Sequence, residues 1–259
     1  MLHIINDKVK MSVKRKVTSN SNVSDASVSK SPYFTNNETE SASIQLKNNA
    51  SRLKDSFYNI PCEDLAKKLL GKVICRKLDT GEVLKGKIVE TESYVGVEDK
   101  SCHSYKGKKT QRNEAMFMKP GTAYVYTIYG MYYCLNISSD GEGAAVLIRS
   151  LEPLWGFETM RAYRTKKRPN GKELKNKELC NGPSKLCMAL DVTKLLNKDD
   201  MTVSDRLWAE DCEDIGDEDI VRSKRIGIDS AGEEWANKFL RFYIRNNIYV
   251  SVRDKKAEM

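Results

Sequence analysis

The chain has 259 residues with a formal net charge of +8, and 40% of these residues are hydrophobic. This length suits one large domain or two small ones. No apolar run approaches the roughly 20 residues of a membrane span, and the start lacks a signal-peptide pattern. We therefore expect a soluble intracellular protein. The positive charge favours a polyanionic partner, with nucleic acid ahead of a membrane surface.

Metal-ligating residue types are few or scattered. The only histidines are His3 and His103, and none of the cysteines forms a Cys-x-x-Cys pair. Structural zinc sites need closely spaced ligands, so we expect no metal centre. Reduced cysteines that pack as small core residues are the better interpretation. The seven cysteines stand at positions 62, 75, 102, 134, 180, 187 and 212.

The beginning of the chain differs in composition from the rest. Residues 18–50 are rich in Ser, Asn and Thr, so they cannot bury enough apolar surface to offset the entropy of ordering. We predict a disordered tail over residues 1–54 and one folded domain over residues 55–259. Lys and Arg cluster within residues 8–16. That cluster fits a nuclear-import signal or a basic arm on DNA, and a merely solvating charge cluster is equally compatible with it.

The predicted elements begin with a helix over residues 61–71, because Pro61 suits a first turn and Gly71 can end a helix. Strands follow, joined by a turn at Asp79-Thr80-Gly81. Strands mixed with helices, without βαβ alternation, predict an α+β fold around a mainly antiparallel sheet. The other expected elements are strands at 72–76, 83–94, 122–128, 132–137 and 144–149, and helices at 152–164 and 184–190.

Charge is unevenly distributed in the second half. Residues 161–177 hold eight Lys and Arg and one acid, with a loop signal at Pro169-Asn170-Gly171. This stretch is a candidate DNA-facing loop, and a solvated loop is an equal alternative. Residues 199–219 are acidic, and we expect them on a solvent-facing surface away from phosphate.

The strand over residues 83–94 carries the first chemical pattern. Alternate residues of a strand share a face, so Glu90, Glu92 and Tyr94 point the same way. A carboxylate can activate water, and a neighbouring aromatic ring can stack on a planar base. An amphipathic strand with a solvated polar face is the alternative. His103, which follows, fits a pocket residue or a structural histidine.

A tyrosine cluster is the second pattern. Five tyrosines surround Gly130 within residues 124–133. If Tyr129-Gly130 forms a hairpin tip, Tyr129 presents an aromatic wedge of the kind that fills a vacated base stack. A tyrosine-rich hairpin packed in the core is the alternative.

Together these segments resemble the alkyladenine (3-methyladenine) DNA glycosylase family. The resemblance runs from about residue 65 to residue 252, and the order and spacing of the motifs match. The chain differs from the family pattern at Gln111 and Phe239, where proline is common, and by one extra residue within Gly232-Glu233-Glu234. The matching motifs are GKIVETESY (86–94), MFMKPGT (116–122), YTIYGMY (126–132), NIS (136–138) and NGPSKL (181–186).

The resemblance implies a role for each matching position. Glu92 is expected to be the general base, with Arg149 and His103 helping to position the attacking water. For the flipped base, Tyr94 and Tyr126 are expected to stack on its faces. His103 is also expected to form a hydrogen bond with the edge of the base, and Asn136 is expected to screen its exocyclic groups. For the DNA, Tyr129 is expected to insert into the minor groove. The other implied DNA contacts come from Met131, Arg112 and Lys185.

For the whole chain, the resemblance implies a monofunctional DNA glycosylase of base excision repair. It would flip alkylated or deaminated purines out of double-stranded DNA (3-methyladenine, 7-methylguanine, hypoxanthine, ethenoadenine) and hydrolyse the N-glycosidic bond, leaving an abasic site. The implied fold is a single domain with a curved antiparallel sheet, surrounding helices and a DNA-inserting β-hairpin. We expect a monomer that needs no cofactor and does not associate with membranes. Its expected location is the nucleus, with the mitochondrion as an alternative or additional location.

Two other classes of function remain open. One is a protein that binds damaged DNA without cleaving it, although such a protein has no need of the Glu92 carboxylate. The other is a general basic RNA- or DNA-binding module that uses stacked tyrosines. That class predicts equal affinity for undamaged single strands and for lesion-bearing duplex.

Overall fold

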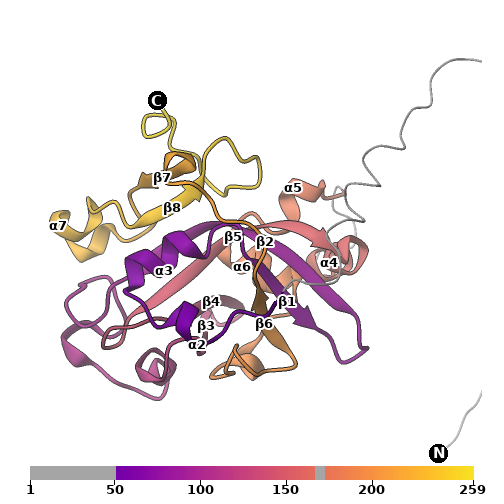
Figure 1. Cartoon of the computed structure of the whole chain (residues 1–259), viewed down its shortest axis with the longest axis horizontal. Coiled ribbons are helices and arrows are strands. Elements are labelled where there is room, and N and C mark those ends of the chain that lie inside the picture. Colours follow the sequence, from indigo (N-terminus) through magenta and orange to yellow (C-terminus); the bar gives the residue numbers. More distant parts are fainter. Residues whose placement is uncertain (1–50, 167–172) are drawn as a thin grey trace, which may run out of the picture. The chain divides into compact units, whose positions relative to one another are not determined.

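The computed structural model describes residues 51–166 and 173–259 (Figure 1). Two predicted segments lie outside the described residues. They are residues 1–50 of the predicted tail, which contain the basic cluster, and the predicted loop at residues 169–171. The contacts of the domain begin slightly before the expected boundary at residue 55. Arg52 forms a β-bridge with Glu210, and Leu53 is buried.

One antiparallel sheet of eight strands organises the domain, which confirms the predicted α+β fold. Six strands follow the order β3-β4-β5-β2-β1-β6, while β8 pairs with β2 and β7 pairs with β8 (Figure 1). The strands are β1 Val73–Lys77, β2 Val83–Tyr94, β3 Ala123–Ile128, β4 Tyr132–Ser138, β5 Ala145–Trp155, β6 Leu207–Glu210, β7 Ile220–Ser223 and β8 Arg241–Ile244.

The long strand β2 curves the sheet. Along one edge its first half pairs with β1, through residues 83–87, and its second half pairs with β8, through residues 90–92. Its other edge pairs with β5 with register shifts around residues 85–86 and 88–91. Such bulges bend a strand and increase its twist. The second half of β2 therefore separates from β1 and lies between β5 and β8.

Short helices cover the sheet. The two predicted helices at residues 61–71 and 184–190 are confirmed as α3 and α6, and their apolar sides, including Leu65 and Leu186, are buried. The helices are α2 Asp55–Tyr58, α3 Cys62–Lys68, α4 Phe157–Thr165, α5 Asn176–Leu179, α6 Pro183–Ala189 and α7 Glu233–Ala236. Single 3-10 turns lie at Tyr105–Gly107, Glu114–Phe117, Lys194–Leu196, Asp217–Asp219 and Asp229–Ala231.

The predicted helix over residues 152–164 is wrong at its start. Residues 152–155 extend β5, where Glu152 and Pro153 pair with Lys87 and Gly86 of β2. Helix α4 begins only after Gly156, whose φ of 87° ends the strand. Sheet pairing therefore overrides the helical pattern, as tertiary contacts commonly do. Strands β6, β7 and β8 are absent from the sequence prediction because each has only four residues.

The interior agrees with the expectation for cysteine. Six of the seven cysteines are buried with free thiols, and Cys212 is exposed. The acidic segment holds both exposed charge and buried structure: Asp211 and Asp214 are exposed, whereas Leu207 and Ala209 of β6 are buried. Among the described residues, no helix is long and apolar enough to cross a membrane.

Gly96 should be intolerant of a side chain, because its φ is 96° and a Cβ atom there would lie 2.3 Å from the carbonyl oxygen of Glu142. We expect Gly96→Ala to lower the free energy of unfolding by roughly 2–5 kcal/mol, combining a left-handed backbone cost with overpacking. Gly107→Ala is the matched control, since φ is 71° there and no atom lies within 4 Å of the added Cβ. Chemical denaturation measures both, and equal losses would contradict the proposed clash.

Candidate active site

A cavity of about 360 Å³ opens beside the second half of β2 and contains most of the predicted site. Its lining comes from strands β2 to β5, from the loop after β2, and from residues 226–228. Six predicted site residues line it: Tyr94, His103, Tyr126, Tyr129, Asn136 and Arg149. The other lining residues are Ser101, Cys102, Met116, Tyr124, Ile128, Cys134, Leu147, Pro183, Ile226, Gly227 and Ile228.

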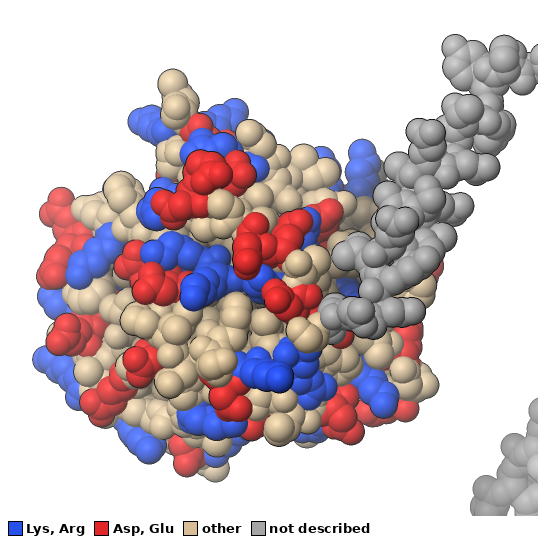
Figure 2. All heavy atoms as spheres, in the orientation of Figure 1, with Lys and Arg blue, Asp and Glu red and all other residues tan. Residues whose placement is uncertain are grey.

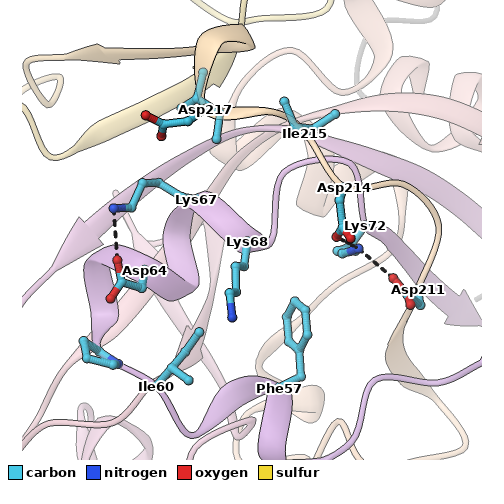
Figure 3. A pocket seen from close by; sticks show the side chains of 12 residues that line it. Phe57, Ile60, Asp64, Lys67, Lys68, Lys72, Asp211, Asp214, Ile215 and Asp217 are labelled. Atoms are coloured by element: carbon cyan, nitrogen blue, oxygen red, sulfur yellow. Dashed lines mark hydrogen bonds and ion pairs between the residues drawn. The ribbon is translucent and has the colours of Figure 1, made fainter.

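A larger cavity of about 680 Å³ lies between α3 and the segment before β7 (Figure 3). Two of its lysines are paired with carboxylates: Lys72 contacts Asp211 at 2.6 Å and Asp214 at 2.7 Å, and Lys67 contacts Asp64 at 3.0 Å. None of the predicted site residues lines this larger cavity. The smaller cavity is therefore the candidate active site.

Glu92 is fully buried beside the cavity and is held at both carboxylate oxygens. The Tyr94 hydroxyl donates to Oε2 at 3.0 Å, and the backbone N–H of Ile226 donates to Oε1 at 2.8 Å. The guanidinium of Arg149 lies 3.1 Å from Oε1. These contacts orient the carboxylate, and they show that this face of β2 is not a solvated surface.

Glu90 supports the same arrangement from two residues earlier. Its Oε1 accepts from Arg149 at 3.2 Å and from Arg241 at 2.9 Å, and its Oε2 accepts from the backbone N–H of Ser251 at 2.7 Å. Arg149 therefore bridges Glu90 and Glu92, which confirms that they share a face. Buried charges need such pairing and hydrogen bonding.

Burial sets the protonation behaviour of Glu92. Removal from water raises the pKa of Glu92, while Arg149, the Ile226 N–H and the Tyr94 hydroxyl favour the charged form and limit the rise. Burial and the neighbouring Glu92 raise the pKa of the Tyr94 phenol, so Tyr94 remains a donor. A carboxylate of raised pKa in a cavity is a stronger base than a carboxylate in water.

Aromatic rings form one wall of the cavity. Tyr124 and Tyr126 stack with centroids 5.3 Å apart, and the His103 ring lies edge-on to Tyr126 at 4.8 Å. His103 Nδ1 is 2.8 Å from the Tyr124 hydroxyl. Asn136 is buried below this wall and donates from Nδ2 to the Tyr124 carbonyl at 3.1 Å.

The hairpin between β3 and β4 ends in a sharp turn at Tyr129-Gly130, as predicted. Tyr129 is 88% exposed with φ of 49°, an uncommon conformation for a residue other than glycine. Met131 beside it is 56% exposed. The alternative of a hairpin packed entirely in the core therefore fails at Tyr129 and Met131, although Tyr124 on the same hairpin is buried.

Three predicted DNA-contacting residues, Met131 at the hairpin tip, Arg112 and Lys185, lie outside the cavity lining. The Arg112 guanidinium lies 5.5 Å from the Tyr126 ring centroid and donates to the Thr127 carbonyl at 3.3 Å, which places it beside the hairpin. Lys185 is exposed on α6 and contacts Asn181 at 3.0 Å. Among the described residues, no group of three or more His, Cys, Asp and Glu side chains is arranged to hold a metal ion.

The sequence analysis missed the segment at residues 225–228. Ile226 acts through its backbone N–H, and Gly227 and Ile228 line the cavity. A backbone donor carries no residue-type signal, and the segment lies more than 130 residues after Glu92 in the chain. Strand pairing of β8 with β2 and of β7 with β8 brings this part of the chain to the site.

The chain is similar in sequence to known DNA glycosylases. The DNA-3-methyladenine glycosylases of Mus musculus and Homo sapiens are 49% and 48% identical to the chain, each over 82% of it. The chain spans 65% of the mouse protein and 72% of the human protein. A putative 3-methyladenine DNA glycosylase of Clostridium perfringens is 49% identical over 77% of the chain and 98% of its own length. The sequence pattern of methylpurine-DNA glycosylase matches residues 56–248, and the chain belongs to this family of DNA glycosylases.

Proposed function

We propose that this chain is a monofunctional DNA glycosylase of base excision repair that hydrolyses the N-glycosidic bond of damaged purines and leaves an abasic site. The observation that carries the proposal is the buried Glu92 carboxylate, oriented by Arg149 at the side of a cavity with tyrosine and histidine walls. The names of the mouse and human relatives give the same reaction class for those proteins.

In the proposed mechanism, the flipped base stacks on Tyr94 and Tyr126 while its sugar lies near Glu92. As the bond from C1′ to the base nitrogen breaks, its electron pair leaves with the base and positive charge develops on the sugar. The Glu92 carboxylate stabilises that charge and accepts a proton from the water that attacks C1′. Arg149 and His103 orient Glu92 and the water.

The proposed substrates are 3-methyladenine, 7-methylguanine, hypoxanthine and ethenoadenine. Extruding a base costs a few kcal/mol and costs least for a damaged or mispaired base, so flipping itself selects against normal pairs. Asn136 adds a second filter against normal guanine, because its buried side chain disfavours the guanine amino group. 7-Methylguanine carries the same amino group, and its release relies on its electron-poor ring as a good leaving group. His103 contributes an edge hydrogen bond to the base.

For binding, we propose that a monomer contacts lesion-bearing double-stranded DNA in the nucleus without a cofactor, with the mitochondrion as an alternative or additional location. Tyr129 would enter the minor groove, with Met131, Arg112 and Lys185 contacting the DNA nearby. Figure 2 shows Lys and Arg interspersed with Asp and Glu on the face that it presents, so positive charge is not concentrated on that face. The exposed hairpin tip is a more specific mark of the DNA-binding side than net charge.

Glu92→Gln should abolish the general base while keeping the side-chain shape. We expect single-turnover excision of hypoxanthine and ethenoadenine from a labelled duplex to slow by about 10²-fold or more. The wild-type rate should also fall as pH decreases through the raised pKa of Glu92, because only the ionised carboxylate accepts a proton. Glu98→Gln, at an exposed position of the loop after β2, is the matched control and should keep the wild-type rate.

The wild-type result of this assay separates the alternative functions. Tight binding to lesion DNA without release of the base would assign the chain to damage sensors. Equal affinity for undamaged single strands and lesion duplex would assign it to general nucleic-acid-binding modules.

Tyr129→Ser should weaken lesion recognition without unfolding the domain, because the ring is almost fully exposed and contributes little to the core. Base stacking on an aromatic ring contributes about 1–3 kcal/mol, so we expect affinity for lesion duplex to fall by roughly 5- to 150-fold. Trp155→Ser, at an aromatic side chain 67% exposed at the end of β5, is the control for loss of a surface ring. Fluorescence anisotropy measures the affinity of both variants for lesion duplex. An equal loss of affinity in both variants would contradict the wedge role of Tyr129.

His103 should be neutral at pH 7, as a hydrogen-bonding pocket residue requires. Desolvation by the surrounding rings and the positive charges of Arg112 and Lys108 lower the pKa of His103. Arg112→Gln removes one of those charges, so the pKa of His103 should rise. An NMR titration of the ring protons measures this pKa, and Lys85→Gln, whose ammonium pairs with Glu210 near β6, should leave it unchanged. A lower pKa of His103 in Arg112→Gln would contradict the proposed electrostatics.

A further inference from the structure

A fully buried ion pair connects two loops that border the candidate active site. Arg225 contacts Asp99 in a forked geometry, with Nη1 at 2.5 Å from Oδ2 and Nη2 at 3.1 Å from Oδ1. Both side chains are 0% exposed. The sequence analysis assigned no role to this pair.

Stability alone does not explain the pair. Taking two charges out of water is costly, and buried ion pairs are often no more stabilising than apolar residues of similar volume. Arg225 adds to the cost, because its Nε is buried without a hydrogen-bond partner in the described part of the chain. What such a pair supplies is a fixed geometry for the segments that carry it.

Arg225 touches the catalytic face of β2 in two ways. Its Nη1 donates to the carbonyl of Ser93 at 2.9 Å, and its guanidinium lies 4.8 Å from the ring centroid of Tyr94. The next residue, Ile226, donates its backbone N–H to Glu92 at 2.8 Å. Fixing Arg225 therefore fixes both the proposed stacking ring and a hydrogen bond to the proposed general base.

Asp99 orders the other loop. Its carboxylate accepts from the backbone N–H and the hydroxyl of Ser101, at 3.0 and 2.6 Å, and from the backbone N–H of Val95 at 3.4 Å. His103 lies two residues beyond Ser101 and lines the cavity with it. The pair thus connects the loop of His103 to the segment that contacts Glu92.

We propose that Asp99 and Arg225 are positioning residues for base excision, holding the Ile226 N–H on Glu92 and the Tyr94 ring in place. This inference rests on the proposed function. The pair touches neither the proposed water nor the base, so its effect passes through Glu92 and Tyr94.

The test uses the full chain carrying Arg225→Lys, which keeps the charge but loses the fork. A second variant combines Asp99→Asn with Arg225→Gln and so removes both charges. Because no unpaired buried charge remains, this double variant should still fold. We expect single-turnover excision of ethenoadenine, per folded molecule, to be about 10- to 100-fold slower, as for a small misplacement of catalytic groups. Affinity for lesion duplex should fall by a smaller factor.

A second measurement reports on Glu92 itself. The Ile226 N–H favours the charged carboxylate, so its displacement should raise the pKa of Glu92, observed in the ¹³C shift of the carboxyl carbon and in the acid limb of the rate profile. The other groups near Glu92 are unchanged in these variants. They are Arg149 of β5, Glu90 and Tyr94 of β2, Tyr126 of β3, Cys134 of β4, and Arg241 of β8, which acts through Glu90.

Lys72→Met is the matched control, because Lys72 is a buried cation paired with two aspartates in the separate cavity of Figure 3. It should lower stability and leave the excision rate per folded molecule and the pKa of Glu92 unchanged. Folded variants at Asp99 and Arg225 with wild-type rate and wild-type pKa of Glu92 would overturn the positioning role. A wild-type chain without excision would overturn the proposed function instead, and the carboxyl titration would still decide whether the pair positions Glu92.

Discussion

The structure around the site depends on two buried carboxylates, Glu90 and Glu92, that lie two residues apart on one strand. An isolated buried carboxylate is strongly unfavourable, so each needs a cation and hydrogen-bond donors from elsewhere in the fold. Arg149 of β5 contacts both, and Arg241 of β8 contacts Glu90. Backbone N–H groups of Ile226 and Ser251 complete the set. Strands β2, β5 and β8 are therefore connected by charge as well as by sheet pairing.

The geometry of β2 makes this arrangement possible. Because the strand changes its partner from β1 to β8 along one edge, its second half packs with C-terminal residues, including Tyr243 and Val250 beside Val89. The same change exposes Tyr94 to the cavity and brings residues 225–228 against Glu92. The register shifts opposite β5 supply the bend. The position of the face that carries Glu92 and Tyr94 is thus a consequence of how the sheet curves.

The cavity combines a rigid side and an exposed side. Glu92, Arg149 and Asn136 are buried on central strands, where side chains are held by their neighbours. Tyr129 and Met131 lie at the tip of a hairpin that projects into solvent, with positive φ at Tyr129. Rigid elements suit the chemical step, and an exposed ring suits contact with a large partner. This division supports the proposed separation between groups that act on the base and groups that enter DNA.

Local patterns in the sequence predict the α+β class, most strands of the central sheet, the turn at Tyr129-Gly130 and the shared face of Glu90 and Glu92, because alternation and turn chemistry are local properties. The resemblance to the glycosylase family adds Tyr94, His103, Tyr126, Asn136 and Arg149 as candidates. Long-range packing, in contrast, establishes that residues 152–155 extend β5, that Ile226 donates to Glu92, and that Asp99 pairs with Arg225. Each of these three features depends on a partner far along the chain or on a backbone group. Distant partners and backbone groups leave no pattern in the types of the neighbouring residues.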